Sequence, residues 1–162
     1  MIELAKRFNE AFEYRNGDIY WKINPNNIKI GSLVGASYPS GYRRTRLDKK
    51  SYSVHRIIYT MFHGEIPDGL HIDHINGVTT DNRIENLRLV TVSQNAMNRK
   101  PRKTNTGIPN VSYCKENGKY RVQITVNNKR MLLEHFDNLE LAELVAIEAR
   151  DKFHGKYARL GA

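Results

Sequence analysis

Turn-forming residues divide this chain into segments that are too short for a domain built of long helices. They recur along the chain, for example at Gly17, Gly31, Gly35, Pro39-Ser-Gly41, Asp48-Lys49, Asn76-Gly77, Asn117-Gly118 and Asn127-Asn128. These residue types tolerate the backbone conformations that tight turns need. Many of the segments between them alternate apolar and polar residues, which is typical of short strands. The 162 residues are therefore expected to form an α+β fold with small antiparallel sheets and few helices.

The first hundred residues are expected to form one domain, with a β-rich part at 1–54 and a core at about 55–100. Apolar residues at helical spacing predict a short helix within 2–14, and alternation predicts a strand at 18–22. A hairpin is expected to turn at Asp48-Lys49. A helix should follow over 54–62.

A basic stretch at 101–106 is expected to be a linker, and residues 107–162 to form a second domain. Hairpin signals separate three strand-like runs, near 109–115, 119–126 and 130–136. The last predicted element is a helix from about Leu139 to His154, which Asp137 should cap. Its apolar stripe should pack on the three-stranded sheet, and it consists of Leu139, Ala142, Val145, Ala146, Ala149 and Phe153.

The chain carries 26 Lys and Arg against 17 Asp and Glu, a formal net charge of +9. Such a surplus favours a polyanionic partner, because each neutralised phosphate of a nucleic acid releases counterions. The single cysteine, Cys114, forms neither an internal disulfide nor a CxxC zinc site, and a half-buried position is expected for it. No apolar run approaches the roughly 18 residues that span a membrane, so no membrane partner and a cytoplasmic location are expected.

The stretch from Leu70 to Arg99 carries the chemistry that this sequence suggests. It is predicted to form a strand, a polar loop, a returning strand from Leu87, and a helix that begins near Thr91. Asp73 and His74 fall at the end of the first strand, and Asn95 falls in the first turns of the helix. A carboxylate, an imidazole and a carboxamide should therefore converge. Neighbours on a strand point to opposite faces, so this convergence requires the strand to end or distort there.

Those three groups suit phosphodiester hydrolysis. Asp73 and the side-chain carbonyl of Asn95 offer hard oxygen ligands, which leave positions for water and a phosphate oxygen, as Mg²⁺ prefers. An unperturbed imidazole has a pKa of about 6.5, so His74 can take a proton from water near neutral pH.

Residues 55–98 resemble the HNH nuclease motif, in the branch common among phage proteins and homing endonucleases. The resemblance rests on the spacing of Asp73-His74, Asn86 and Asn95. It implies a ββα-metal fold in which His74 is the general base, Asp73 and Asn95 bind Mg²⁺, Mn²⁺ or another divalent cation, and Asn86 pins the loop and orients His74. The expected activity is cleavage of double-stranded DNA. No structural zinc is expected, and His55 is expected to support the fold.

Residues 106–161 resemble an AP2 domain, mainly in Gly118-Lys-Tyr-Arg-Val-Gln-Ile124 and His135-Phe136-Asp137. The resemblance implies a sheet that lies in the major groove of DNA. On the second strand, Lys119, Arg121 and Gln123 should face DNA, while the alternate residues pack on the helix. The predicted DNA-binding residues are Arg43, Arg44, Arg46, Arg99, Arg102, Lys103, Tyr113, Lys115, Lys119, Arg121, Gln123, Lys129 and Arg130.

Two other functions stay open at the level of sequence. One is a non-catalytic, sequence-specific DNA-binding regulator of the AP2 type, in which the nuclease motif is inactive. The other is an RNA-binding or ribosome-associated basic protein. The chain offers no dedicated dimer helix, so a monomer or weak dimer is expected.

Overall fold

The computed structural model describes residues 2–98 and 104–157. Within these ranges the fold is mixed α+β, with four α-helices and several small antiparallel sheets. The chain divides into two compact units between Val92 and Ser93, and each is described by itself. No helix in the described ranges is long and apolar enough to cross a bilayer.

The first unit opens with helix α1 (Ile2–Ala11) and a hairpin of β1 (Phe12–Arg15) and β2 (Asp18–Trp21). The predicted short helix within 2–14 is therefore confirmed, but it ends before Phe12. Phe12 instead pairs with Trp21 across the hairpin, where their ring centroids lie 4.8 Å apart and both side chains are buried. This burial outweighs the continuing helical pattern. Gly17 completes the turn, because its φ is +91° and a Cβ would lie 2.9 Å from the backbone nitrogen of Arg83.

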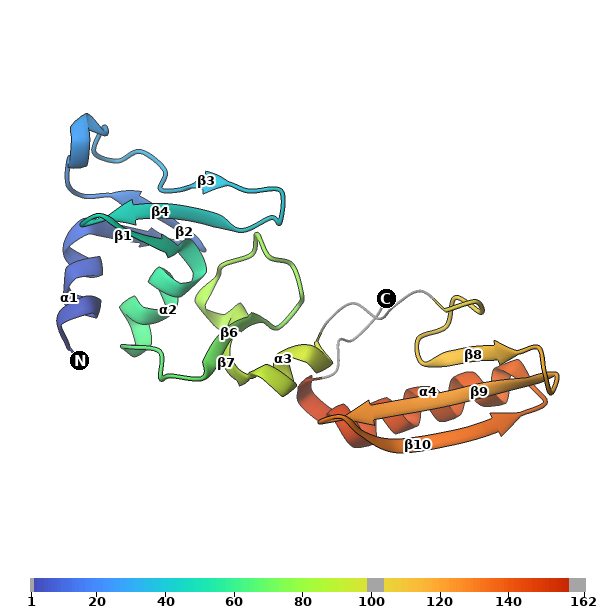
Figure 1. The fold of residues 1–162 in the computed structure, drawn as a ribbon. Helices are drawn as coiled ribbons and strands as arrows, with labels where there is room; N and C mark the ends of the chain where they lie inside the picture. Colours follow the sequence, from blue (N-terminus) through green and yellow to red (C-terminus); the bar gives the residue numbers. More distant parts are fainter. Residues whose placement is uncertain (1, 99–103, 158–162) are drawn as a thin grey trace. The chain divides into compact units, whose positions relative to one another are not determined.

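A three-stranded sheet follows, with β3 (Ala36–Ser37), β4 (Arg43–Leu47) and β5 (Lys50–Ser53) in that order. A single 3₁₀ turn (Pro25–Asn27) precedes it. The predicted hairpin is confirmed, since Asp48 and Lys49 both have positive φ between β4 and β5. The predicted helix is also confirmed as α2 (Val54–His63), which leaves β5 directly and ends at Gly64 (Figure 1).

The core of the first unit joins α1, α2 and the two hairpins. Phe8 from α1, Ile19 from β2 and Ile57 from α2 are almost completely buried in one cluster. Leu47 and Val54 extend this cluster to the β4–β5 hairpin. This packing determines which face of β4 and β5 points towards the core.

The predicted order of strand, loop and strand is confirmed by β6 (Leu70–His74), the 3₁₀ turn at Ile84–Asn86 and β7 (Leu87–Thr91). The two strands pair antiparallel, and Asp73 lies opposite Arg88. Helix α3 (Val92–Met97) begins immediately after β7, as the sequence predicted.

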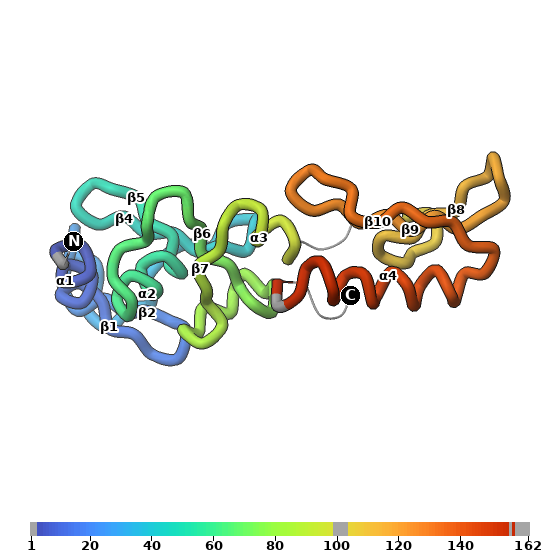
Figure 2. The backbone as a smooth tube through the Cα atoms, turned by 90° about the horizontal axis from the view of Figure 1, so that it is seen from below, coloured from blue at the N-terminus to red at the C-terminus, as the bar shows by residue number. Residues whose placement is uncertain are grey.

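The second unit contains β8 (Val111–Cys114), β9 (Lys119–Val126), β10 (Lys129–Phe136) and α4 (Leu139–His154), followed by a 3₁₀ turn (Gly155–Tyr157). The strand order is β10-β9-β8, and α4 runs along one face of this sheet (Figures 1 and 2). Val111 and Val122 from the sheet are buried against Ala142 and Ala146 of the helix. The three strands, the helix and the packing of its apolar stripe are confirmed.

The predicted cap of α4 was wrong by one residue. Asn138, not Asp137, precedes the helix in an extended conformation, and its side-chain oxygen accepts a hydrogen bond from the Leu141 backbone nitrogen at 3.0 Å. Asp137 instead forms an exposed ion pair with Lys119, 3.2 Å between the charged atoms. Asn and Asp cap helices about equally well, so the backbone course after β10 decides which residue does so.

Candidate active site

His74 is the last residue of β6, and its side chain is almost completely buried. Its Nε2 atom lies 2.9 Å from Oδ1 of Asn82, a buried residue of the loop between β6 and β7. An amide oxygen only accepts hydrogen bonds, so this contact places the proton on Nε2 and leaves Nδ1 as the basic nitrogen. An imidazole held by such a contact, with its other ring nitrogen as the basic one, is suited to proton transfer.

Two further rings cover His74. The ring centroid of Tyr42, which precedes β4, lies 5.9 Å from that of His74, and that of His55 on α2 lies 5.3 Å away. Tyr42 and His55 also contact each other, at 5.1 Å. Burial, together with the neighbouring His74 and Arg56, lowers the pKa of His55 to about 3, so His55 is neutral at physiological pH.

Asn86 fastens the loop that carries Asn82. Its Oδ1 accepts from the backbone nitrogen of Asn76 at 3.1 Å, and its Nδ2 donates to Oδ1 of Asn76 at 3.0 Å and to the carbonyl of Asp81 at 2.8 Å. Asp81 also accepts from the side chain of Arg83, which holds the pKa of this carboxyl well below its usual range. These contacts fix both ends of the loop.

Asp73, the first predicted metal ligand, is buried beside His74 on β6. Its Oδ2 contacts Nε of Arg88 at 2.9 Å and Nη2 of Arg88 at 2.8 Å. The paired register continues through Asp73 to His74, where the strand ends and the chain turns. A buried carboxylate requires a positive partner, and its hard oxygens are ligands that Mg²⁺ prefers. Arg88 is that partner in this structure, and the carboxylate oxygens are also of the kind that binds a divalent cation.

Asn95, the second predicted metal ligand, lies on α3 and belongs to the second unit. Its pairing with Asp73 stays a prediction. Across residues 2–98 and 104–157, no three His, Cys, Asp or Glu side chains gather into a metal site. A cation here would depend on one carboxylate, amide oxygens and water.

The predicted DNA-binding residues of the first unit divide between the two faces of β4. Arg43 points inward and pairs with Asp18, and only 14% of its side chain is exposed. Arg44 and Arg46 are exposed on the other face. This difference follows from the alternation of side chains along the strand.

In the second unit, the predicted alternation along β9 is confirmed for the buried residues Val122 and Ile124. Arg121 donates to Ser112 Oγ at 3.2 Å on the outer face of the sheet. Tyr113 alternates with the buried Val111 and contacts the ring of Tyr120 at 5.2 Å, so it shares the face that carries α4. Lys115, Lys129 and Arg130 are exposed, and Arg99, Arg102 and Lys103 lie outside the described residues.

Two residues of this site were missed in the sequence. They are Asn82 and Tyr42. Asn82 belongs to the pair Asp81-Asn82, which is typical of a turn, and Tyr42 stands at the expected start of a strand, so neither was singled out. Three asparagines, Asn76, Asn82 and Asn86, lie in or beside the loop, and no local pattern distinguishes the one that contacts His74.

The site lies within a segment with known relatives. The family model described as HNH endonuclease matches residues 52–97, which include Asp73, His74, Asn82 and Asn86. These residues form an HNH endonuclease domain. No solved structure matches the chain significantly.

Comparison with curated proteins gives the wider relationship. Protein 3.8 of Escherichia phage T7 is 34% identical over 108 residues, which cover 65% of this chain and 87% of the phage protein. The chain belongs to the same family as that phage protein. The uncharacterized HNH endonuclease L560 of Acanthamoeba polyphaga mimivirus is 28% identical over 127 residues, or 78% of this chain and 63% of the viral protein. YosQ, a prophage-derived protein of Bacillus subtilis named as a candidate HNH homing endonuclease, is 33% identical over 57 residues, a third of its length.

Proposed function

We propose that this protein is a metal-dependent endonuclease that hydrolyses phosphodiester bonds in double-stranded DNA, with His74 as the general base. The observation that carries the proposal is the contact between Nε2 of His74 and Oδ1 of Asn82 inside the HNH segment. It leaves Nδ1 as the nitrogen that takes a proton. The net charge of +9 supports a nucleic-acid substrate.

In this mechanism, Nδ1 of His74 removes the proton from the attacking water. Asn82 stabilises the imidazolium that results, because its amide oxygen continues to accept the Nε2 proton. Asn86 keeps the loop, and with it Asn82, in place. Asp73 and Asn95 would hold the divalent cation. When bound, such a cation polarises the phosphate and stabilises the leaving oxygen.

The second unit would hold the duplex. Its sheet, with one helix on a single face, leaves the side with Arg121 and Gln123 for DNA, in the manner that the AP2-like sequence pattern implies. The family includes a phage protein, so action in the cytoplasm of a host cell fits this proposal.

The decisive variant is His74→Ala, tested on duplex DNA with Mg²⁺ or Mn²⁺. Loss of the base should lower the cleavage rate by about 10²–10⁴-fold, while metal-free DNA binding stays within a few fold. His71→Ala is the matched control, because His71 lies on the same strand and is exposed. Cleavage by the His74 variant at the wild-type rate would show that His74 is not the general base. Binding by the wild type without cleavage in any divalent metal would favour a regulator.

A further inference from the structure

The outer face of the β4–β5 hairpin is polar and basic. Arg44 lies opposite Ser53, and Arg46 lies opposite Ser51, so these four side chains share one face. The alternate residues Leu47 and Tyr52 belong to the hydrophobic core on the inner face. The outward direction of Arg44 and Arg46 is therefore set by the packing of the first unit.

This outer face continues into the candidate active site. Tyr42 stands two residues before Arg44, and its ring contacts both His55 and His74. Gly41, just before it, has a φ of +82°, and a Cβ there would lie 2.4 Å from Oγ1 of Thr79 in the β6–β7 loop. Strand β4 thus begins beside His74 and leads away from it.

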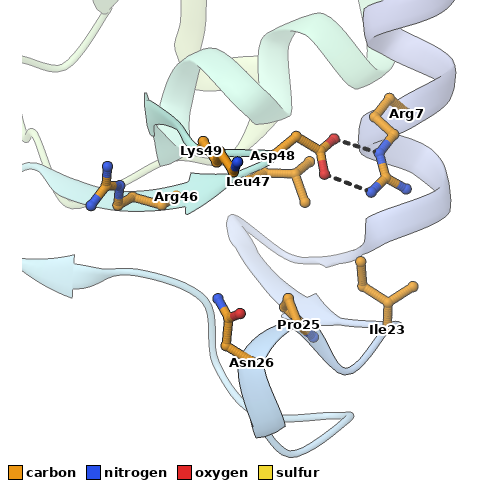
Figure 3. A pocket seen from close by; sticks show the side chains of 8 residues that line it. All are labelled: Arg7, Ile23, Pro25, Asn26, Arg46, Leu47, Asp48 and Lys49. Atoms are coloured by element: carbon orange, nitrogen blue, oxygen red, sulfur yellow. Dashed lines mark hydrogen bonds and ion pairs between the residues drawn. The ribbon is translucent and has the colours of Figure 1, made fainter.

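The positive charges on this face are available to a ligand. In the part of the chain that the structure describes, no carboxylate forms an ion pair with Arg44 or Arg46. The acidic residue at the tip, Asp48, is held by Arg7 at 2.7 and 2.9 Å. Figure 3 shows this carboxylate directed at Arg7 and the guanidinium of Arg46 pointing away from it.

A shallow cavity of about 430 Å³ lies along this face, lined by Tyr38, Arg44, Thr45, Arg46, Lys49 and Ser51. Residues two apart on a strand are separated by about 6.7 Å. This step is comparable with the distance between neighbouring phosphates along one nucleic-acid strand. Guanidinium groups at that spacing suit a row of phosphates, since each can bind phosphate oxygens in bidentate fashion.

We propose that the outer face of the β4–β5 hairpin is a phosphate track for the DNA strand that is cut. Arg44 binds the phosphate closer to the scissile bond, and Arg46 binds the next one outward. This inference rests on the proposed nuclease function and adds to it a direction in which the strand leaves the site.

The test uses the full chain and a duplex whose cut position has been mapped. Single phosphates beside the cut are replaced by neutral methylphosphonates, and kcat/KM at that cut is measured for the wild type, Arg44→Gln and Arg46→Gln. On unmodified DNA each variant should lose about 5–10-fold. With one phosphate neutralised, the wild type and Arg44→Gln should have the same kcat/KM. With the next phosphate outward neutralised, the wild type and Arg46→Gln should have the same kcat/KM. The proposed track would be refuted if no neutral phosphate made a variant equal to the wild type. It would also be refuted if the phosphate matched to Arg46 lay closer to the cut than the one matched to Arg44.

A second measurement needs no cleavage. Metal-free DNA binding is followed against salt concentration, and each of the two variants should reduce the slope of log K against log[salt] by about one. Arg15→Gln is the control and should leave the slope unchanged, because Arg15 is exposed on β1 and paired with Glu13. Unchanged slopes for both hairpin variants would refute the proposal. Reduced slopes without any cleavage by the wild type would refute the nuclease function and leave the hairpin as a DNA-binding surface.

Discussion

His74 has a defined tautomer because a buried amide, and not solvent, lies beside its Nε2. In water the two neutral tautomers of imidazole exchange, and a base would present the wrong nitrogen part of the time. The 2.9 Å contact with Asn82 removes that ambiguity. At the scale of single residues, the candidate site thus pairs the proposed base with a buried amide that contacts it.

Replacement of Asn82 by Ala should therefore lower kcat by about 10–100-fold, with KM within a few fold, because the base is misoriented while the DNA-binding surface is intact. Single-turnover cleavage measures this change, and long-range ¹H–¹⁵N spectra of His74 report the tautomer directly. Glu85→Ala, an exposed change near the same loop, is the control. An unchanged tautomer and unchanged kcat in the Asn82 variant would show that Asn82 does not orient His74.

His55 gives a prediction about stability and pH. Burial lowers its pKa to about 3 in the folded protein, against about 6.5 in the unfolded chain. Between these values the unfolded state binds more protons, so this residue costs stability as pH falls from about 6.5 towards 3. Its contribution to the slope is at most about 1.4 kcal/mol per pH unit.

His55→Phe keeps an aromatic ring and removes the titration. Unfolding by urea at pH 7.0 and pH 5.0, followed by Trp21 fluorescence, should show a smaller loss of stability on acidification for this variant than for the wild type. Trp21 is the only tryptophan of the chain and lies in the core of the first unit. Equal losses for the two proteins would mean that His55 titrates normally.

At the scale of elements, the ends of helices and strands are fixed by individual side chains. Helix α4 starts where Asn138 accepts the hydrogen bond of Leu141. The loop between β6 and β7 is likewise held by three hydrogen bonds of Asn86. Both asparagines satisfy backbone groups that the regular elements leave unpaired.

Asn138→Ala should lower the stability of the second unit by about 1 kcal/mol, the usual cost of a lost helix cap. Asp137→Ala should cost less, because its ion pair with Lys119 is exposed. Chemical denaturation followed by far-UV circular dichroism compares the two variants. A larger loss of stability for Asp137→Ala than for Asn138→Ala would indicate that Asp137 caps α4, as the sequence predicted.

At the scale of the whole molecule, the two units have separate hydrophobic cores. One contains residues from α1, α2, the first two hairpins and the β6–β7 pair, and the other contains residues from the second sheet and α4. Among the described residues, each cluster draws on one unit only. Each unit is therefore expected to respond on its own to a change in its core.

Val122→Ala tests this expectation, because Val122 is fully buried in the second core. The change should lower the stability of the second unit by about 1–3 kcal/mol. The unfolding midpoint reported by Trp21 in the first unit should remain that of the wild type. Thr125→Ala, an exposed change on the same strand, is the control. A shift of the Trp21 midpoint by the Val122 variant would show that the units unfold together.

Much of this fold could be predicted from the sequence because local patterns decide it. The turn at Asp48-Lys49, the alternation along β9 and the apolar stripe of α4 each lie within a few neighbouring residues. The errors fell where distant contacts compete with such patterns. Phe12 continues a helical pattern but is taken into a hairpin by its contact with Trp21.

The candidate site divides in the same way. The spacing of Asp73, His74 and Asn86 located the candidate site in the chain, since a strand, a loop and a returning strand follow from local propensity. Only the tertiary structure decided that Asn82 contacts His74, that Tyr42 and His55 cover its ring, and that Arg44 points outward while Arg43 points in. Most of these contacts join residues far apart in the sequence, and that of Asn82 with His74 depends on how the loop folds back. None of them is encoded by a local pattern.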